Sequence, residues 1–449
     1  MSAAALLTEL RTRGVRLRRR DDQLVCVGAL PEELTPRVRD SKNQILEILD
    51  EEAHTFRAVL GRAGTGKTYM VRSMAEADRS MVLTATTGIA AVNLGSGTIN
   101  ALLGYFDTES LKDAYVSQRL HGRLRKLADS GLTHVVVDEV SMMDGDQLTL
   151  LVRAIDFVNR VREGRRRLRL TVVGDWAQLP PVKAPFAFES PEWPRFEAGT
   201  TVLTEVKRQT DRDFIEALNT TRRGDGRGAV GFFRPLLHEA QDTEFDGTTI
   251  MGRNDKVAAH NQLRLDKLPG ARIAFHAYRW GRQLPEWRKE IPDVLELKEG
   301  AVVMILANRR LSRESPDFVY ANGDLGTLLG QDPSGQAVVR LQRNGEDVPV
   351  ETVEREAYRP TGRKGAPKEV DGLITYMPLR CAYATTAHKG QGLTLDRVQV
   401  DLRDYFLCNP GSLYVALSRA RTAQGLRLVG TPSEFIARCQ ADPRVRRWL

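Results

Sequence analysis

The stretch GRAGTGKTYM, residues 61–70, contains the spacing G-x-x-x-x-G-K-[ST] and directly follows the short apolar run FRAVL. Its glycines allow backbone N–H groups to turn inward around phosphate oxygens, where a larger side chain would clash. A helix that begins near Lys67 would add the positive end of its dipole to the same place. The stretch therefore predicts an α/β fold in which a strand, a phosphate-binding loop and a helix follow one another.

Two further apolar runs predict parallel strands that end in polar residues. Asp138 and Glu139 directly follow the valines 135–137, and Gln178 lies shortly after the run TVVGD. Open parallel sheets bind ligands at the carboxyl ends of their strands. We therefore expect Glu139 to polarise an attacking water and Gln178 to contact the γ-phosphate or that water.

The phosphate loop and the second strand together predict a site for ATP and Mg²⁺. Lys67 is expected to reach the β- and γ-phosphates. The Thr68 hydroxyl and the Asp138 carboxylate are expected to ligate Mg²⁺, because this ion prefers oxygen ligands. A carboxylate after a run of valines is a weak pattern alone, but it becomes strong beside an upstream phosphate loop.

Length and composition set wider bounds. A chain of 449 residues is expected to form two to four domains, and 66 Lys and Arg against 58 Asp and Glu give a net charge of +8. That charge favours a polyanionic partner without establishing one. The four cysteines lie far apart without metal-type spacing, and the start of the chain has no apolar stretch of signal-peptide length. We expect a cytoplasmic protein with no membrane segment.

The order of the motifs resembles that of superfamily 1 helicases. The run from residue 53 to residue 430 is most similar to the 5′→3′ branch, the RecD-like, Dda-like and PIF-like enzymes. The resemblance is carried by GRAGTGKT, TATTGIAA, VVVDEVSMMD, VVGDWAQLPPV, LTEVKRQTDRDFIEAL, ATTAHKGQGLTLD and YVALSRARTAQGLRLVG. It implies an ATP-dependent DNA helicase with two RecA-like cores that have parallel sheets, acting on single-stranded DNA and tailed duplex DNA.

The resemblance also implies roles for particular residues. Arg208 in VKRQ and Arg419 in ALSRAR match two arginines that reach the γ-phosphate from the second core, so the expected catalytic residues are Lys67, Glu139, Gln178, Arg208 and Arg419. Nucleotide binding is assigned to Gln44, Gly61, Arg62, Ala63, Gly64, Thr65, Gly66, Lys67, Thr68 and Gln391. DNA contact is assigned to Thr86, Thr87, Gly88, Thr386, His388 and Lys389.

The expected domains follow from the same comparison. Residues 51–204 are expected to form the first core, with a small wedge insertion near 98–130, and residues 205–449 the second. The turn signals DPSG and RNGED predict hairpins, within an SH3-like β insertion at about 326–377. Tyr105 and Phe106 near the wedge are candidates for base stacking, although buried aromatics are the more common case.

Residues 1–50 follow a different pattern. They predict a small α/β module and resemble the TubC-type docking domains of nonribosomal-peptide and polyketide enzymes, which implies a protein partner. Gln44, the expected adenine reader, lies in the last helix of this module, so either that helix serves two domains or adenine recognition is weakened. The basic cluster Arg11, Arg13, Arg16, Arg18, Arg19 and Arg20 is compatible with an acidic partner, with DNA or with a solvated face.

Two other functions stay open at this point. A nucleotide-dependent binding switch would need no arginine directed at the γ-phosphate. An RNA helicase of the same superfamily would show the same motifs, because contacts to phosphates do not distinguish the two nucleic acids.

Overall fold

The computed structural model describes the whole chain except residues 1, 21–22, 95, 284–286, 289–290, 308, 311–317, 321–323, 359–369, 388–389 and 392. The chain forms two compact units. The first comprises Met1–Phe233, Asn409–Ser418 and Ile436–Leu449, and the second comprises Arg234–Cys408 and Arg419–Phe435. Each unit contains a parallel sheet.

The first unit is built on a six-stranded sheet whose strands are all parallel. In spatial order the strands are β5 (Gly97–Thr98), β4 (Met81–Ala85), β6 (His134–Asp138), β7 (Arg169–Gly174), β3 (Phe56–Gly61) and β8 (Thr200–Leu203). The three expected strands lie side by side as β6, β7 and β3. Strand β6 is buried throughout, as its continuous apolar run requires.

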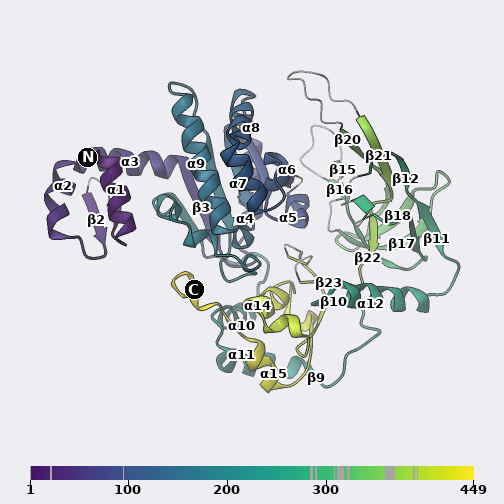
Figure 1. Ribbon diagram of the computed structural model, residues 1–449. Coiled ribbons are helices and arrows are strands. Elements are labelled where there is room, and N and C mark those ends of the chain that lie inside the picture. Colours follow the sequence, from purple (N-terminus) through teal and green to yellow (C-terminus); the bar gives the residue numbers. More distant parts are fainter. Residues whose placement is uncertain are drawn as a thin grey trace. The chain divides into compact units, whose positions relative to one another are not determined.

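The first unit also contains helices, which Figure 1 labels. These are α4 (Lys67–Ala77), α5 (Gly88–Asn93), α6 (Ile99–Leu103), α7 (Thr108–Val116), α8 (Arg119–Asp129), α9 (Gly145–Val161), α10 (Arg212–Arg222) and α11 (Gly226–Phe233). Helices α6 to α8 occupy the region where the wedge insertion was expected, and the wedge itself stays a prediction. Tyr105 is buried in the core of this unit, whereas Phe106 is 83% exposed.

The N-terminal module contains α1 (Ala3–Thr12), the antiparallel hairpin β1 (Arg16–Arg20) and β2 (Gln23–Val27), α2 (Thr35–Asp40) and α3 (Lys42–Thr55). Its apolar side chains form a separate small core, which includes Leu6, Leu10, Ile45 and Leu49. Helix α3 belongs to this core and runs directly into β3 of the first sheet, as Figure 1 shows. Helix α3 therefore packs in the core of the module and leads directly into the first sheet.

The end of the chain returns to the first unit. Helix α14 (Ser412–Leu417) and the 3₁₀ helix η8 (Pro443–Trp448) belong to it, although 175 residues of the second unit precede α14 as the block Arg234–Cys408. Trp448 packs against Trp176 and Trp193, with ring centroids 6.1 and 5.8 Å away. This contact adds Trp448 to an aromatic cluster in the core of the first unit.

The second unit has its own parallel sheet. Its strands in spatial order are β23 (Ala384–Thr386), β10 (Thr248–Met251), β24 (Val398–Asp401), β25 (Leu426–Val429) and β9 (Leu237–His238). Helices α12 (Asn254–Lys267) and α15 (Pro432–Arg438) accompany it, and the chain returns to the first unit within α15.

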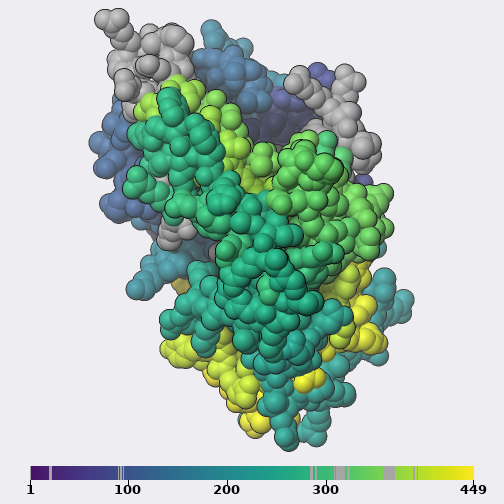
Figure 2. Space-filling model, turned by 90° about the vertical axis from the view of Figure 1, so that its right-hand side faces the viewer, coloured from purple at the N-terminus to yellow at the C-terminus, as the bar shows by residue number. Residues whose placement is uncertain are grey.

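Antiparallel strands form the rest of the second unit. One sheet has the order β19 (Asp347–Val350), β18 (Ala337–Leu341), β17 (Leu325–Gln331), β14 (Val302–Ile305) and β22 (Leu379–Cys381). A second sheet has the order β12 (Tyr278–Gly281), β21 (Val370–Tyr376) and β20 (Val353–Tyr358). Two short antiparallel pairs complete the set: β11 (Ile273–His276) with β13 (Val294–Leu297), and β15 (Arg309–Arg310) with β16 (Phe318–Tyr320). This region, coloured green, forms much of the face shown in Figure 2. Hairpins occur at DPSG and RNGED. The sheets extend beyond residues 326–377, and their SH3-like character stays a prediction.

The division into units differs from the expected boundary at residue 204. Residues 205–233, 409–418 and 436–449 group with the first unit, because their contacts are made there. The boundary at residue 50 falls inside the continuous helix α3. Within the part of the chain that the structure describes, no helix is long and apolar enough to cross a membrane. The cytoplasmic location stays a prediction.

Candidate nucleotide site

The phosphate loop lies between β3 and α4. Gly64 and Gly66 adopt φ angles of +80° and +83°, a left-handed conformation that glycine accepts without strain. Helix α4 begins at Lys67, as expected, with Gly66 as its N-cap. The Lys67 Nζ donates hydrogen bonds to the carbonyl oxygens of Gly61 and Arg62 at 2.8 and 2.9 Å, so the ammonium is folded back onto its own loop.

The expected metal ligands lie within hydrogen-bond distance of each other. The Thr68 hydroxyl donates to Asp138 Oδ2 at 3.0 Å, which joins the start of α4 to the end of β6. Asp138 is buried, and desolvation raises the pKa of its carboxyl although Lys67 and hydrogen bonds oppose the shift. A hydroxyl and a carboxylate at this separation fit an ion that takes few protein oxygens and keeps several waters, as Mg²⁺ does.

Glu139 has an unusual backbone conformation next to this pair. Its φ of 56° and ψ of 43° place a non-glycine residue in the left-handed region, and its side chain is largely buried. Such conformations cost about 1–3 kcal/mol and occur where the surroundings hold the residue in place. Here the Thr86 hydroxyl donates to the Glu139 carbonyl at 2.8 Å, and the Thr86 N–H donates to the Asp138 carbonyl at 3.1 Å.

Several charged side chains shift the pKa of the Lys67 ammonium. Burial lowers the pKa of the Lys67 ammonium, and the positive charge of Arg208 lowers it further. The charges of Asp175, Glu139 and Asp138 act in the opposite direction. Three carboxylates and one guanidinium therefore surround the lysine, an arrangement that can hold a charged phosphate together with a divalent cation.

Arg208 lies in the first unit rather than in the second core, where we expected it. The backbone N–H groups of Lys207 and Arg208 donate to the Gly64 carbonyl at 2.7 and 3.1 Å. A Cβ atom added at Gly64 would lie 2.8 Å from the Arg208 Cβ. The segment that contains Arg208 therefore packs directly on the phosphate loop. Its guanidinium Nη1 donates to the Ser418 carbonyl at 2.8 Å.

The end of β7 contributes a buried carboxylate that the motif analysis did not select. Asp175 is 1% exposed and pairs with Arg222 of α10, whose Nη2 lies 2.7 Å from Oδ1. Burial alone would raise the pKa of the Asp175 carboxyl, but the charge of Arg222 and hydrogen bonds hold it below the usual range. Gln178 is buried in the same turn, and its N–H donates to the Asp175 carbonyl at 3.0 Å.

The segment expected to contact DNA in the first core has mixed surroundings. Thr86 is tied to Asp138 and Glu139 by the two hydrogen bonds given above. The Thr87 hydroxyl accepts from the Ala90 N–H at 3.2 Å at the start of α5, and Gly88 is exposed with open space where a Cβ would lie. Thr86 thus joins the expected DNA segment to Asp138 and Glu139, while Gly88 is exposed.

The remaining predicted residues lie in the second unit or outside the site. Thr386 is buried at the end of β23, and Gln391 and Arg419 are each 2% exposed. His388 and Lys389 lie outside the described residues. Gln44 is exposed on α3, and its role as adenine reader stays a prediction. The roles of all these residues stay predictions.

The basic cluster of the N-terminal module is occupied by ion pairs. Arg16 and Arg18 both pair with Glu197 of the first core, and Arg11 pairs with Glu52 at 2.6 Å. The other described members are paired too, Arg13 with Glu9 and Glu33 and Arg19 with Asp50. These contacts favour a structural role for the cluster over contact with DNA or an acidic partner. A protein partner for residues 1–50 stays a prediction.

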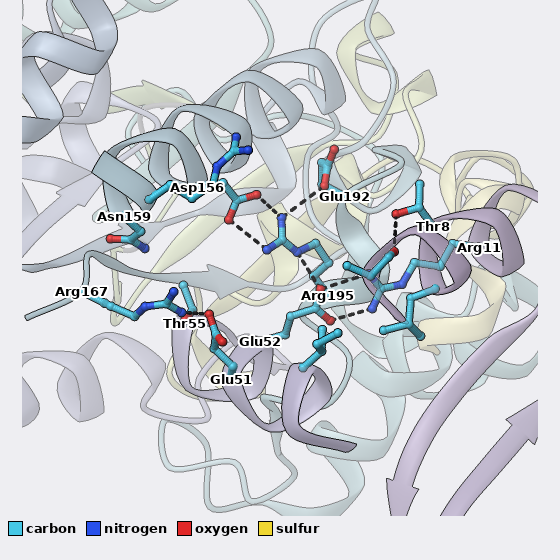
Figure 3. Close-up of a pocket in the computed structure, with 14 residues that line it drawn as sticks. Thr8, Arg11, Glu51, Glu52, Thr55, Asp156, Asn159, Arg167, Glu192 and Arg195 are labelled. Atoms are coloured by element: carbon cyan, nitrogen blue, oxygen red, sulfur yellow. Dashed lines mark hydrogen bonds and ion pairs between the residues drawn. The ribbon is translucent and has the colours of Figure 1, made fainter. Parts of the chain in front are cut away.

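A cavity of about 520 Å³ lies at the junction of the module and the core (Figure 3). Arg195 is at its centre, with hydrogen bonds from its guanidinium to Glu52 at 2.9 Å, to Asp156 at 2.9 Å and to Glu192 at 3.5 Å. Burial alone would lower the pKa of Arg195, but the three carboxylates, Asp156 foremost, raise it above its usual value. Glu52 thereby links Arg11 of the module to Arg195 of the core.

The parallel sheet and the phosphate loop with its carboxylates define a P-loop nucleoside triphosphatase. A family model described as an AAA domain matches residues 40–236. The ATP-dependent DNA helicase Pif1 of Bdellovibrio bacteriovorus is 32% identical over 419 residues, which cover 89% of each chain. The chain therefore belongs to the Pif1 family of ATP-dependent DNA helicases.

Other relatives are longer than this chain. The human ATP-dependent DNA helicase PIF1 is 31% identical over 424 residues, and the match spans 89% of this chain but 63% of the human protein. Among solved structures, the Pif1 helicase from Candida albicans superposes with a TM-score of 0.65 at 25% identity, covering 94% of this chain and 98% of that one. A Bacteroides Pif1 in complex with ADP-AlF3 and ssDNA superposes with a TM-score of 0.61 at 25% identity and covers 94% of this chain and 96% of that one.

Three residues of the site were missed at the level of sequence. Tyr414 stands in the quoted motif YVALSRAR, where attention went to the arginine, and its hydroxyl accepts from the Ala63 N–H of the phosphate loop at 2.8 Å. Asp175 was noted only as the end of a strand. Arg222 has no motif signal, because its partner is 47 residues away in the sequence.

Proposed function

We propose that this protein is an ATP-dependent 5′→3′ DNA helicase that translocates on single-stranded DNA and separates tailed duplexes. Family membership supports the activity, and the relatives include a Bacteroides Pif1 bound to ssDNA. Because the chain spans 63% of the human relative, the activity of that longer protein is carried over only as a proposal.

The observation that carries the proposal is the arrangement around Lys67. The lysine, the Thr68–Asp138 pair and Glu139 come from two segments, the start of α4 and the end of β6, which meet at one edge of the sheet. Arg208 brings a permanent positive charge to the same place, which suits the charge that spreads over phosphoryl oxygens during hydrolysis. A nucleotide-dependent binding switch gains nothing from such a residue.

Each residue has a defined part in this proposal. Lys67 exchanges its loop carbonyls for the β- and γ-phosphates of ATP, and the loop N–H groups hold the phosphates. Glu139 polarises the attacking water, and Gln178 orients it against the γ-phosphate. Arg208 and Arg419 stabilise the transition state, Gln44 reads adenine, and Gln391 couples the nucleotide to DNA bound in the second unit.

Thr68 and Asp138 would hold Mg²⁺ in this site. Bound there, the ion would supply positive charge that offsets the negative charge developing on the phosphate oxygens during hydrolysis. The Thr68 hydroxyl would then turn its proton away from Asp138, since both oxygens are needed as ligands.

The test is an unwinding assay with purified protein and ATP on duplexes that carry either a 5′ or a 3′ single-stranded tail. We expect strand separation only from the 5′ tail, together with ATPase activity stimulated by single-stranded DNA. Unwinding only from the 3′ tail would contradict the polarity. ATPase activity that ignores nucleic acid would favour the binding switch instead.

The choice between DNA and RNA is tested separately with matched oligonucleotides of the same sequence. We expect stimulation by DNA to exceed stimulation by RNA, as the ssDNA complexes of the relatives suggest. Equal or greater stimulation by RNA would support an RNA helicase, which would have to tolerate or recognise the 2′-hydroxyl groups.

A further inference from the structure

Helix α14 of the first unit lies against three nucleotide-binding segments at once. At its start, Gly411 has a φ of +77°, and a Cβ there would lie 2.6 Å from the Ala177 carbonyl oxygen and 2.8 Å from that of Gln178. At its end, the Ser418 carbonyl accepts from Arg208. The chain passes into the second unit between Ser418 and Arg419, so this helix directly precedes the expected arginine finger.

Between these two contacts, Tyr414 bonds the phosphate loop to the end of β7. Its hydroxyl accepts from the Ala63 N–H at 2.8 Å and donates to Asp175 Oδ2 at 3.1 Å. The tyrosine is 3% exposed and its ring packs with Ala63 and Ala177. A hydroxyl has a single proton, so accepting from one partner and donating to the other fixes the orientation of both bonds.

Asp175 extends this connection to α10 and to the end of the chain. Arg222 pairs with Asp175, and the same guanidinium donates to the Trp448 carbonyl at 3.2 Å. The loop, β7, α10 and α14 are therefore joined by one buried network. Breaking a buried network of this kind leaves polar groups without partners, so its members are expected to move together.

We propose that Tyr414 is a positioning residue, which transmits the state of the phosphate loop through α14 to the segment that carries Arg419. This inference rests on the proposed ATPase function and names a contact that the function alone does not require. A change at the loop that moves the Ala63 N–H moves the hydroxyl bonded to it. Since α14 is short and held at both ends, that movement reaches Ser418 and the next residue without loss in a flexible linker.

The test compares Tyr414→Phe with Arg419→Ala in a double-mutant cycle of the ssDNA-stimulated ATPase. Tyr414→Phe keeps the ring and removes both hydrogen bonds, and we expect kcat to fall about tenfold while the KM for ATP changes less than about threefold. In an Arg419→Ala background, the same change should lower kcat by less than about twofold, because the residue acts through the arginine.

Tyr320→Phe is the matched control. Tyr320 is a buried tyrosine of the second unit whose hydroxyl accepts from the Glu351 N–H at 3.1 Å. The Tyr320→Phe variant loses a comparable hydrogen bond, and we expect its kcat for ATP hydrolysis to stay within about twofold of wild type. If Tyr414→Phe failed to fold, Gly411→Ala would displace α14 by steric conflict and should give the same non-additive loss with Arg419→Ala.

A second measurement keeps the inference separate from the helicase activity. Hydrogen exchange of the amides in residues 411–418 is followed with and without ADP–aluminium fluoride. Binding should protect these amides in the wild type and not in Tyr414→Phe, even if DNA does not stimulate hydrolysis. An unchanged kcat in Tyr414→Phe, an equal loss with and without Arg419, or equal protection in both proteins would overturn the inference.

Discussion

At the scale of single residues, the site owes its character to charges held close together while water is largely excluded. Lys67, Asp138, Glu139 and Asp175 are each less than a tenth exposed, and Arg208 is close enough to influence the lysine. Electrostatic interactions are stronger there than at the surface, and groups already in position do not need to reorganise during the reaction. Small changes to these side chains should therefore affect the rate more than the affinity.

The substitution Arg208→Ala tests whether a charge in this site affects the rate of hydrolysis more than the affinity for ATP. We expect kcat for ATP hydrolysis to fall by at least about a hundredfold, while the affinity for ATP changes by less than about threefold, because the guanidinium acts mainly on transition-state charge. Steady-state kinetics and nucleotide titration measure the two effects. Arg223→Ala is the matched control, since this arginine pairs on the surface with Glu216 of α10 and should leave both values near wild type. Equal losses of affinity and rate would remove Arg208 from the catalytic group.

How much of the site could be predicted from sequence depends on how far apart its partners are. The phosphate loop and the two carboxylates after β6 follow local patterns, so their segments could be placed from the sequence. Tyr414 could not be connected with Ala63, because 351 residues separate them and only the folded chain shows the hydrogen bond. The grouping of Arg208 with the first unit could not be predicted for the same reason, since its contact with Gly64 is not visible in a motif.

At the scale of elements, buried strands and terminal segments hold the first core together. His134 lies in the fully buried strand β6, with its Nε2 2.8 Å from the Thr171 hydroxyl of β7. Burial lowers the pKa of this imidazole to about 4, and Arg169 contributes to the shift. The expected fold depends on such strands, yet the histidine within one gave no sequence signal.

The depressed pKa of His134 predicts a pH dependence of stability. In the unfolded state the His134 imidazole takes up a proton as the pH falls below its ordinary pKa of about 6.5. In the folded state it stays neutral until about pH 4. Stability is therefore complete above pH 6.5 and declines as the pH falls toward 4, by about 2 kcal/mol between pH 7 and pH 5. Thermal unfolding at both pH values should show a larger drop for the wild type than for His134→Gln, and equal drops would contradict the assignment.

The C-terminal helix η8 is predicted to stabilise the first core. Trp448→Ala removes a half-buried indole from contact with Trp176, Phe188 and Trp193, and we expect a loss of about 2–3 kcal/mol, less than for a fully buried tryptophan. Thermal unfolding measures the loss. The exposed Arg446 in the same helix supplies a control, because Arg446→Ala should leave the melting temperature unchanged. No loss in Trp448→Ala would show that the chain end is dispensable.

At the scale of the whole molecule, each unit is discontinuous in sequence, and the chain passes between them several times. The crossing after Ser418 lies directly before Arg419, and the return within α15 precedes the segment that ends at Trp448. Local patterns predicted strands of the first parallel sheet and the family resemblance implied the second sheet, but neither could show which terminal segments belong to which unit. That assignment depends on contacts such as those of α14 and η8, which join residues hundreds of positions apart.

The N-terminal module is the last feature to be tested at this scale. Its resemblance to docking domains stays a prediction. Its helix α3 continues into β3, and Arg16, Arg18 and Arg11 form ion pairs with Glu197 and Glu52. Deleting residues 1–50 should lower the melting temperature by about 5 °C or more, because it leaves two largely buried carboxylates without these partners. ATPase activity stimulated by single-stranded DNA should persist below the lowered melting temperature, because the deletion spares the phosphate loop, but with a raised KM for ATP, because it removes Gln44, the proposed adenine reader.

Arg13→Ala separates the junction from the module itself. Arg13 pairs only with Glu9 and Glu33 among the described contacts, both within the module, and its side chain is 45% exposed. Its loss should leave the melting temperature nearly unchanged, whereas Arg16→Ala combined with Arg18→Ala should reproduce part of the effect of the deletion. If the deletion left the melting temperature unchanged, the module would be a tethered appendage, and the ion pairs at Glu197 and Glu52 would contribute nothing to the stability of the first core.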